Sequence, residues 1–97
     1  MIHSFATKPT EDIYYDNKSK RARNLLPTKL WQLAHRKLDM LDAAVELKDL
    51  RSPPGNKLET LKGDRKGQHS IRINDQYRIC FTWHKGQAED IEIVDYH

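Results

Sequence analysis

The side chains best suited to chemistry in this sequence lie in two stretches of its second half. The first is "EIVDYH", in which Asp95, Tyr96 and His97 stand side by side and can all exchange protons. His97 is the favoured acid or base, because a free imidazole has a pKa near ~6.5. A tyrosine, near ~10, would need cationic neighbours to act as a base. Ionised Asp95 is better suited to orienting His97 or an arginine.

Strand alternation places a condition on this triplet. The pattern of "DIEIVDYH" predicts a strand, in which Asp95 and His97 share one face and Tyr96 points to the other. The three side chains then meet in one pocket only if the chain bends after Val94. Tyr96 is therefore the weakest of the three assignments, although its ring could also stack on a nucleobase.

The second stretch is "IRINDQYRIC", which predicts a β-hairpin that carries two arginines. A two-residue loop would mix apolar and charged side chains on one face of the sheet. A three-residue loop at residues 74–76 instead pairs Ile71 with Ile79 and gathers the apolar side chains on one side. In that register Arg72 and Arg78 become direct cross-strand neighbours.

Two guanidinium groups side by side indicate that an anion belongs between them. Like charges opposite each other destabilise a sheet by ~0.5 kcal/mol, and the planar fork of arginine donates two parallel hydrogen bonds to a phosphate. The alternative is that Asp75, Glu59 or the acids near residue 95 pair with these arginines. The polar face of the hairpin would then be a salt-bridge network that serves stability only.

A long helix and four strands are predicted to position these groups. The helix covers residues 27–46, where Pro27 fits a first-turn position and "RSPPGN" stops the pattern. Its apolar residues recur at helical spacing: Leu30, Ala34, Leu38, Leu41 and Val45. Strands follow with a period of two: "KLETLKG", "GQHSIRI", "QYRICFTW" and "DIEIVDYH". This order predicts an α+β fold with helices packed on one face of a twisted, mainly antiparallel sheet.

The segment before residue 26 is less informative. "MIHSFA" fits a short edge strand, and "TEDIYY" begins like a helix with Thr10 as its N-cap. "DNKSKRARN" is polar and basic, which is typical of an exposed linker or a ragged helix end.

Composition narrows the class of protein. The 97 residues suit one domain, 1–97, and 37% hydrophobic with 32% charged residues is typical of a globular chain. No apolar run approaches the ~20 residues that span a bilayer, and the N-terminal stretch lacks a signal-peptide pattern. The single Cys80 makes no internal disulfide, so cytoplasmic residence is expected, with no membrane partner.

The net charge of +3 is unevenly distributed along the chain. Basic residues gather in "NKSKRAR" and between residues 57 and 78, which favours a nucleic-acid partner. Ordinary solvated surface is the alternative. The histidines and Cys80 lack ligand-like spacing, so neither a metal site nor another cofactor is expected.

The stretch "LETLKGDRKGQHSIRINDQYRICFTW", together with "EIVDYH", resembles the HigB-type toxins of the RelE/ParE superfamily from bacterial type II toxin–antitoxin systems. The resemblance begins at the helical "LWQLAHRKLDMLDAA" and runs to the end of the sequence. It implies a RelE-like fold and a ribosome-dependent endoribonuclease that inhibits translation. Such an enzyme cuts mRNA in the ribosomal A site by attack of a ribose 2′-hydroxyl on the adjacent phosphate, without a metal. The implied partners are the ribosome and a HigA-type helix-turn-helix antitoxin, through which alone operator DNA is contacted.

The resemblance also implies roles for individual residues. Arg78 matches the arginine that contacts the scissile phosphate, and residues 95–97 match the C-terminal catalytic group. Glu59 departs from the pattern, because related toxins often carry a histidine there. The expected RNA-binding residues all lie in the basic stretch: Lys57, Glu59, Lys62, Arg65 and Arg72.

Two other functions remain open. One is a non-enzymatic toxin of the same fold that binds DNA gyrase; "DYH" argues against it, because the gyrase-binding members lack the acid/base set. The other is an RNA- or ribosome-binding module that blocks translation sterically.

Overall fold

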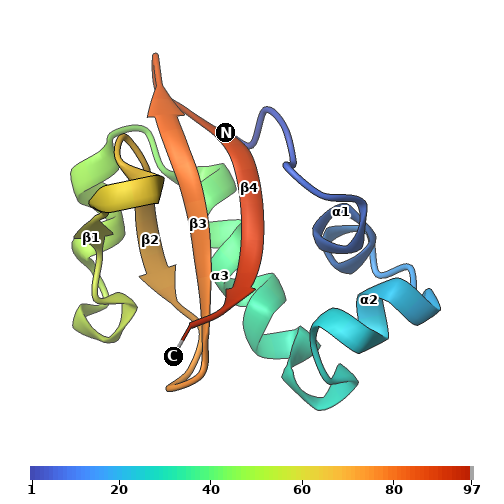
Figure 1. Ribbon diagram of the computed structural model, residues 1–97. Coiled ribbons are helices and arrows are strands. Elements are labelled where there is room, and N and C mark those ends of the chain that lie inside the picture. The colour runs from blue at the N-terminus through green and yellow to red at the C-terminus, as the bar shows by residue number, and fades with distance from the viewer. Residues whose placement is uncertain (97) are drawn as a thin grey trace.

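This computed structural model describes residues 1–96 of the chain. They contain four antiparallel strands and three α-helices, joined by short 3-10 turns and loops (Figure 1). The sheet has the order β1-β2-β3-β4. Its strands are β1 Glu59–Thr60, β2 His69–Arg72, β3 Tyr77–His84 and β4 Gln87–Asp95. The helices are α1 Lys8–Tyr14, α2 Lys20–Leu25 and α3 Trp31–Ala43. The predicted α+β fold is confirmed.

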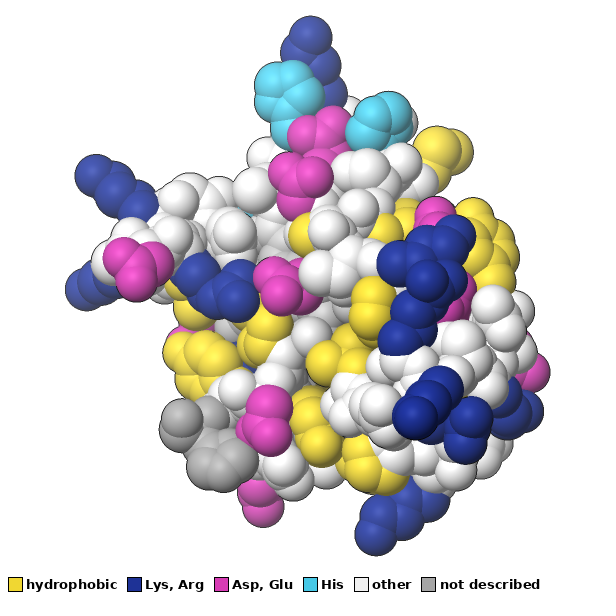
Figure 2. Space-filling model, turned by 45° about the vertical axis from the view of Figure 1, so that its right-hand side comes forward, with side chains coloured by type: hydrophobic (Ala, Val, Ile, Leu, Met, Phe, Trp, Pro, Cys, Tyr) yellow, Lys and Arg dark blue, Asp and Glu magenta, His cyan; other side chains and the backbone are white. Residues whose placement is uncertain are grey.

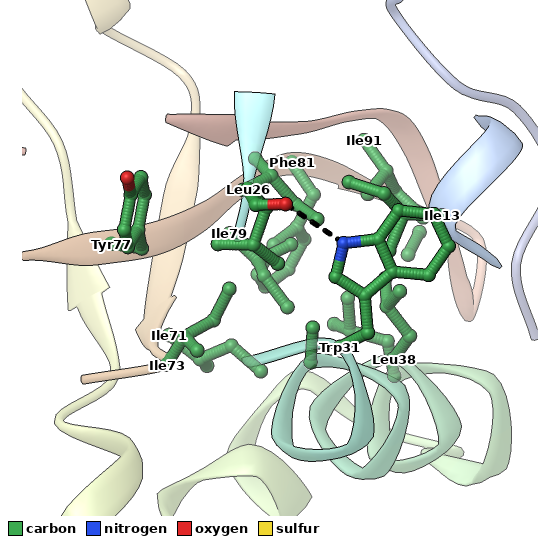
Figure 3. Packing of buried hydrophobic residues seen from close by; sticks show 14 of the residues in the cluster. Ile13, Leu26, Trp31, Leu38, Ile71, Ile73, Tyr77, Ile79, Phe81 and Ile91 are labelled. Carbon is green, nitrogen blue, oxygen red and sulfur yellow. Dashed lines mark hydrogen bonds between the residues drawn. The ribbon is translucent and has the colours of Figure 1, made fainter. Parts of the chain in front are cut away.

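The core lies between α3 and one face of the sheet. Leu38 of α3 is fully buried, as are Ile71, Ile79 and Phe81 of the strands, so the hydrophobic effect holds the two layers together (Figure 3). Trp31 at the start of α3 satisfies its one polar group within this core. Its indole Nε1 donates a 2.8 Å hydrogen bond to the backbone oxygen of Leu26.

The long helix is confirmed, but it ends earlier than the periodicity predicts. A 3-10 turn at Thr28–Leu30 precedes α3, and the backbone becomes extended at Ala44. The carboxylate of Asp49 accepts hydrogen bonds from the amides of Val45 and Glu46, which starts a new 3-10 turn in place of another helical one. Val45, which the periodicity assigned to the buried face of the helix, is therefore 75% exposed.

Two predictions for the first 26 residues are wrong. The N-cap of α1 is Thr7, whereas Thr10 is buried inside the helix and its hydroxyl accepts the backbone N–H of Ile93 at 3.1 Å. The basic segment, expected to be an exposed linker or a ragged helix end, instead contains the capped helix α2. Ser19 caps α2 by accepting the amide of Ala22, whose side chain is fully buried.

The N-terminal segment, predicted as a short edge strand, pairs with β4 through two isolated bridges instead of forming a strand. Ile2 and Phe5 form isolated parallel bridges to Ala88 and Ile91. The outer edge of β4 is thus partly covered by backbone that is far away in the sequence (Figure 1).

The predicted hairpin register is confirmed. Ile71 pairs with Ile79, and Arg72 lies opposite Arg78. The loop at residues 74–76 is closed by Asn74, whose side-chain oxygen accepts the amides of residues 76 and 77 at 2.9 and 2.8 Å. The loop thereby fixes which side chains of β3 face the core.

A buried carboxylate links the first two helices. Asp12 is 3% exposed and accepts 2.7 Å hydrogen bonds from Arg21 and from Ser19. These two bonds hold the pKa of Asp12 at about 2, against an ordinary value of 3.8.

We expect the helical layer to lose stability in acid through Asp12. Its folded pKa lies below its unfolded pKa, so its contribution is complete above pH 3.8 and is lost as the pH falls through about 2. The Asp12→Asn variant should be less stable at neutral pH, and its stability should change less between pH 4 and 2. Urea unfolding across this range measures the difference. Asp64→Asn, on an exposed turn, is the control; equal pH profiles for Asp12→Asn and the wild type would contradict the assignment.

Candidate active site

The sheet has a second face, which carries Ser70, Arg78, Cys80, Glu92 and Val94 and is called the polar face below. The register places Cys80 opposite both Ser70 and Glu92, and Arg78 opposite Val94. These side chains therefore point away from the α3 core, because side chains alternate along a strand.

Arg78 is the centre of the polar face. It is only 6% exposed, and its guanidinium is held from two sides. Nε donates to the hydroxyl of Ser70 at 2.8 Å, and one terminal nitrogen, Nη2, donates to the backbone oxygen of Lys57 at 2.6 Å. The other terminal nitrogen, Nη1, lies 3.7 Å from the carboxylate of Glu59. Arg78 is thus fixed by its neighbours, while Nη1 faces an acid that is half exposed.

Tyr96 lies beside Arg78 without any bend after Val94. Its ring centroid is 5.5 Å from the guanidinium carbon, a cation–π contact. Its amide donates a 2.6 Å bond to the backbone oxygen of Gln76, which extends the strand pairing by one residue. Because Val94 pairs with Arg78, alternation carries Tyr96 to the polar face. Tyr96, which had the weakest assignment of the three tail residues in the sequence analysis, therefore lies next to Arg78.

Asp95 takes the other direction. Its strand partner is Tyr77, a core-facing residue, and its carboxylate accepts a 3.0 Å bond from the side chain of Gln76. His97, the predicted acid or base, lies outside the described residues. Of the three predicted catalytic residues of the tail, the structure describes two. Tyr96 lies on the polar face, and Asp95 lies beside the hairpin loop.

Arg72 and Arg78 each pair with an internal acid, the alternative considered from the sequence. Arg72 pairs with Asp75, and Arg78 with Glu59. Both acids are much more exposed than their partners: 99% for Asp75 and 50% for Glu59. Ion pairs with exposed partners contribute ~0–1 kcal/mol, so an incoming anion can replace these carboxylates at small cost.

The remaining predicted RNA-binding residues divide into two groups. The side chains of Lys57 and Lys62 are exposed to solvent. Arg65, in contrast, is half-buried and already bound: it donates to Gln68 at 3.0 Å and to Glu92 at 3.3 Å. The pair between Arg65 and Glu92 ties the loop after β1 to the polar face.

Sequence reasoning missed two contributors to the site. Ser70 lies diagonally across from Arg78 on the polar face, and the predicted register contained this signal. Lys57 was expected to act through its side chain, yet its backbone oxygen is what binds Arg78. No residue type reveals a backbone acceptor, so that contact required the structure.

A second basic surface lies away from the sheet. Figure 2 shows Lys and Arg side chains gathered on the right of the view, on the side of the molecule that carries α1 and α2. The exposed cations of the α2 segment are Lys18, Lys20, Arg21 and Arg23. Such a surface favours an anionic partner.

Residues 1–96 contain neither a cluster of metal-ligating side chains nor a helix that could cross a membrane. No three His, Cys, Asp or Glu side chains in this part cluster in a way that could hold a metal ion. The longest helix there, α3, has 13 residues, and none has the length and apolar character that crossing a membrane requires.

Comparisons with known proteins identify sequence relatives. The family described as "RelE-like toxin of type II toxin-antitoxin system HigB" matches residues 3–97. Toxin HigB-1 of Vibrio cholerae serotype O1 is 46% identical over 88 residues, which cover 91% of this chain and 90% of that relative. Endoribonuclease HigB of Proteus vulgaris is 31% identical over 97 residues, and the match covers 100% of both chains.

Solved structures with this fold include a YoeB–YefM complex and a YoeB dimer, both from Staphylococcus aureus. The chain matched in the complex has a TM-score of 0.62 and 18% identity, covering 100% of this chain and 98% of that one. The matched chain of the dimer has a TM-score of 0.57 and 22% identity, with 99% and 97% covered. At such low identity the likeness concerns the fold alone.

We expect Cys80 to be inert in the folded protein. It is fully buried on the polar face, and burial raises the pKa of its thiol, so little thiolate is present at neutral pH. A maleimide should label it at least ~1,000-fold more slowly in the native state than in denaturant. Arg65→Ala should speed native labelling, because Arg65 binds Glu92, the strand neighbour of Cys80. Rapid labelling of the native wild type would contradict this burial.

Proposed function

This chain belongs to the HigB family of RelE-like toxins from type II toxin–antitoxin systems, and we propose that it is an endoribonuclease that cuts mRNA in the ribosomal A site and so inhibits translation. The observation that carries the proposal is the fixed guanidinium of Arg78. One of its terminal nitrogens faces an exposed carboxylate that a phosphate can replace, and an aromatic ring lies over it.

The proposed reaction is an internal transfer of the phosphoryl group. The ribose 2′-oxygen loses its proton to a base and bonds to the adjacent phosphorus, the bond to the 5′-oxygen breaks, and an acid protonates that oxygen. The nucleophile is part of the substrate, so positioning supplies much of the rate and the step requires no metal. Charge builds up on the phosphate oxygens, which a pre-oriented arginine stabilises.

Arg78 is assigned to the scissile phosphate and Arg72, its strand neighbour, to the adjoining backbone. Arginine suits both tasks, because its fork can donate two bonds to one phosphate. The exposed side chains of Lys57 and Lys62 are assigned to more distant phosphates. Arg65 belongs to the same predicted RNA-binding set, but its bonds to Gln68 and Glu92 indicate that it mainly holds the loop in place.

Acid and base are assigned among Glu59 and the tail. Glu59 takes the place of the family histidine and is the proposed base: its half-exposed carboxylate, once displaced from Arg78 by the phosphate, would remain beside the ribose that carries the 2′-hydroxyl. His97 is the proposed acid, and Asp95, which binds Gln76 beside the hairpin loop, is assigned to holding the tail in place. The ring of Tyr96 lies over Arg78, which suits it to hold the guanidinium and to stack on a nucleobase.

The proposed partners follow from the family. One solved structure with this fold is described as a heterotetrameric complex of the YoeB–YefM toxin–antitoxin from Staphylococcus aureus. For this chain we propose a HigA-type helix-turn-helix antitoxin, through which the pair reaches operator DNA. The other partners are the ribosome and its bound mRNA, which implies action in the cytoplasm.

We expect Arg78→Lys to lower mRNA cleavage by at least ~100-fold. Lysine keeps the charge, but it cannot hold Ser70, the oxygen of Lys57 and a phosphate together. Cleavage ends are mapped by primer extension on mRNA in a reconstituted translation system, with and without ribosomes. Arg23→Lys on exposed α2 is the matched control.

Three results of this experiment would count against the proposal. Full cleavage by Arg78→Lys, or by a chain lacking His97, would overturn the catalytic assignments. Equal cleavage without ribosomes would overturn ribosome dependence. Intact mRNA combined with DNA damage in expressing cells would favour the gyrase-binding alternative.

We expect Glu59→Gln to cut at least ~100-fold more slowly, because the amide cannot accept the 2′-proton. Glu59→His, which introduces the histidine that the family resemblance implies at this place, should recover much of the rate. Single-turnover cleavage of ribosome-bound mRNA measures both variants. If Glu59 serves only as a counter-ion for Arg78, the glutamine variant will instead cut as fast as the wild type.

A further inference from the structure

The helical layer contains a buried cation that the proposed reaction does not use. Lys37 of α3 is 9% exposed, and its ammonium donates a 2.6 Å bond to the side-chain oxygen of Asn56. No carboxylate among residues 1–96 forms an ion pair with it. Burial lowers the pKa of Lys37, and the charges of Arg72 and Arg36 lower it further. A buried charge without an opposite charge is costly, so its partner is informative.

That partner, Asn56, is fully buried and uses both ends of its side chain. The oxygen accepts from Lys37, while the amide nitrogen donates to the backbone oxygens of Leu50 and Ser52 at 3.1 and 3.3 Å. An asparagine side chain has two donors and one acceptor group, and all of these functions are engaged here. Asn56 therefore ties residues 50–56 to α3.

The next residue carries the contact with Arg78. Lys57 has a left-handed backbone conformation, φ 46° and ψ 56°, which residues other than glycine adopt only at an energetic cost. The 3-10 turn Pro54–Asn56 holds it there, with its amide bonded to the oxygen of Pro54 at 3.1 Å. In this conformation its own oxygen accepts from Nη2 of Arg78 at 2.6 Å.

The oxygen of Lys57 determines the direction of the guanidinium. Nε donates to the hydroxyl of Ser70 at 2.8 Å, and Nη2 also reaches the backbone oxygen of Ser70, but over a long 3.4 Å. The bond from Nη2 to the oxygen of Lys57 is much shorter, 2.6 Å, and therefore contributes most to fixing the plane and the side from which Nη1 meets a ligand.

We propose that Asn56, held by Lys37, is a positioning residue for Arg78: it fixes the Lys57 oxygen on which the guanidinium rests. Its catalytic meaning rests on the proposed function. The chain of contacts runs from α3, through the buried amide, to the polar face on the other side of the sheet.

The test combines a structural and a kinetic measurement on the full chain. The Nε–H signal of Arg78 is observed by nitrogen-15 NMR without RNA, and is assigned by its loss in Arg78→Lys. In Asn56→Ala the signal should shift and exchange with water at least ~10-fold faster. The cleavage kcat should fall at least ~10-fold while KM stays within ~2-fold, because a misdirected arginine fails mainly in the transition state.

Further variants separate positioning from general stability. Lys37→Met removes only the donor to Asn56, so it keeps the proposal testable if Asn56→Ala does not fold. Lys37→Arg restores a donor and should return both the signal and kcat toward the wild type. Lys29→Met and Asn24→Ala are matched controls, because both side chains are exposed, Asn24 within α2 and Lys29 just after it. They should change neither the Arg78 signal nor kcat.

Each outcome decides the proposal. An Arg78 signal that is unchanged in the folded Asn56→Ala and Lys37→Met variants overturns the positioning role, whether or not the protein cuts mRNA. A shifted signal with unchanged kcat overturns its catalytic meaning. If the wild type does not cut mRNA at all, the proposed function fails, and the NMR measurement alone still decides whether Asn56 positions Arg78.

Discussion

The register of the β2–β3 hairpin is the constraint on which the site depends. Side chains alternate with a period of two, so a slip of one residue would turn Arg78 into the core and Ile79 out to solvent. The side chain of Asn74 prevents that slip by closing the loop over two amides. The same register gives Arg78 its bond to Ser70, while the pairing of β3 with β4 brings Tyr96 beside it. Loop chemistry and the burial of one face thus determine the chemistry of the other face.

The two arginines illustrate how one arrangement serves both stability and binding. The half-buried Arg72 forms an ion pair with the exposed carboxylate of Asp75, and the buried Arg78 forms one with that of Glu59. These acids offset the repulsion between the two guanidinium groups while no ligand is bound. They are also exposed enough to yield to a stronger anion. Under the proposed function, the salt-bridge network and the anion site are two states of the same residues rather than competing explanations.

The hairpin and α3 could be predicted because their apolar spacing admits one solution with a buried face. The position of Tyr96 could not, because alternation within β4 relates Tyr96 only to its chain neighbours, whereas the pairing of Val94 with Arg78 brings it to the site. The helix α2 could not be recognised from the sequence, because most of its residues are charged or polar and only Ala22 and the N-cap Ser19 indicate a helix. The acceptor on Lys57 belongs to the backbone, about which side-chain types say nothing.

The bridges of Ile2 and Phe5 to β4 have a consequence for how this sheet could grow. Backbone already covers part of the β4 edge, so the described sheet is more open to strand addition along β1, which has two residues. An extended segment of another protein laid there would run beside Glu59, the carboxylate that rests on Arg78. Growth of the sheet by one strand would therefore alter the electrostatic surroundings of the arginine.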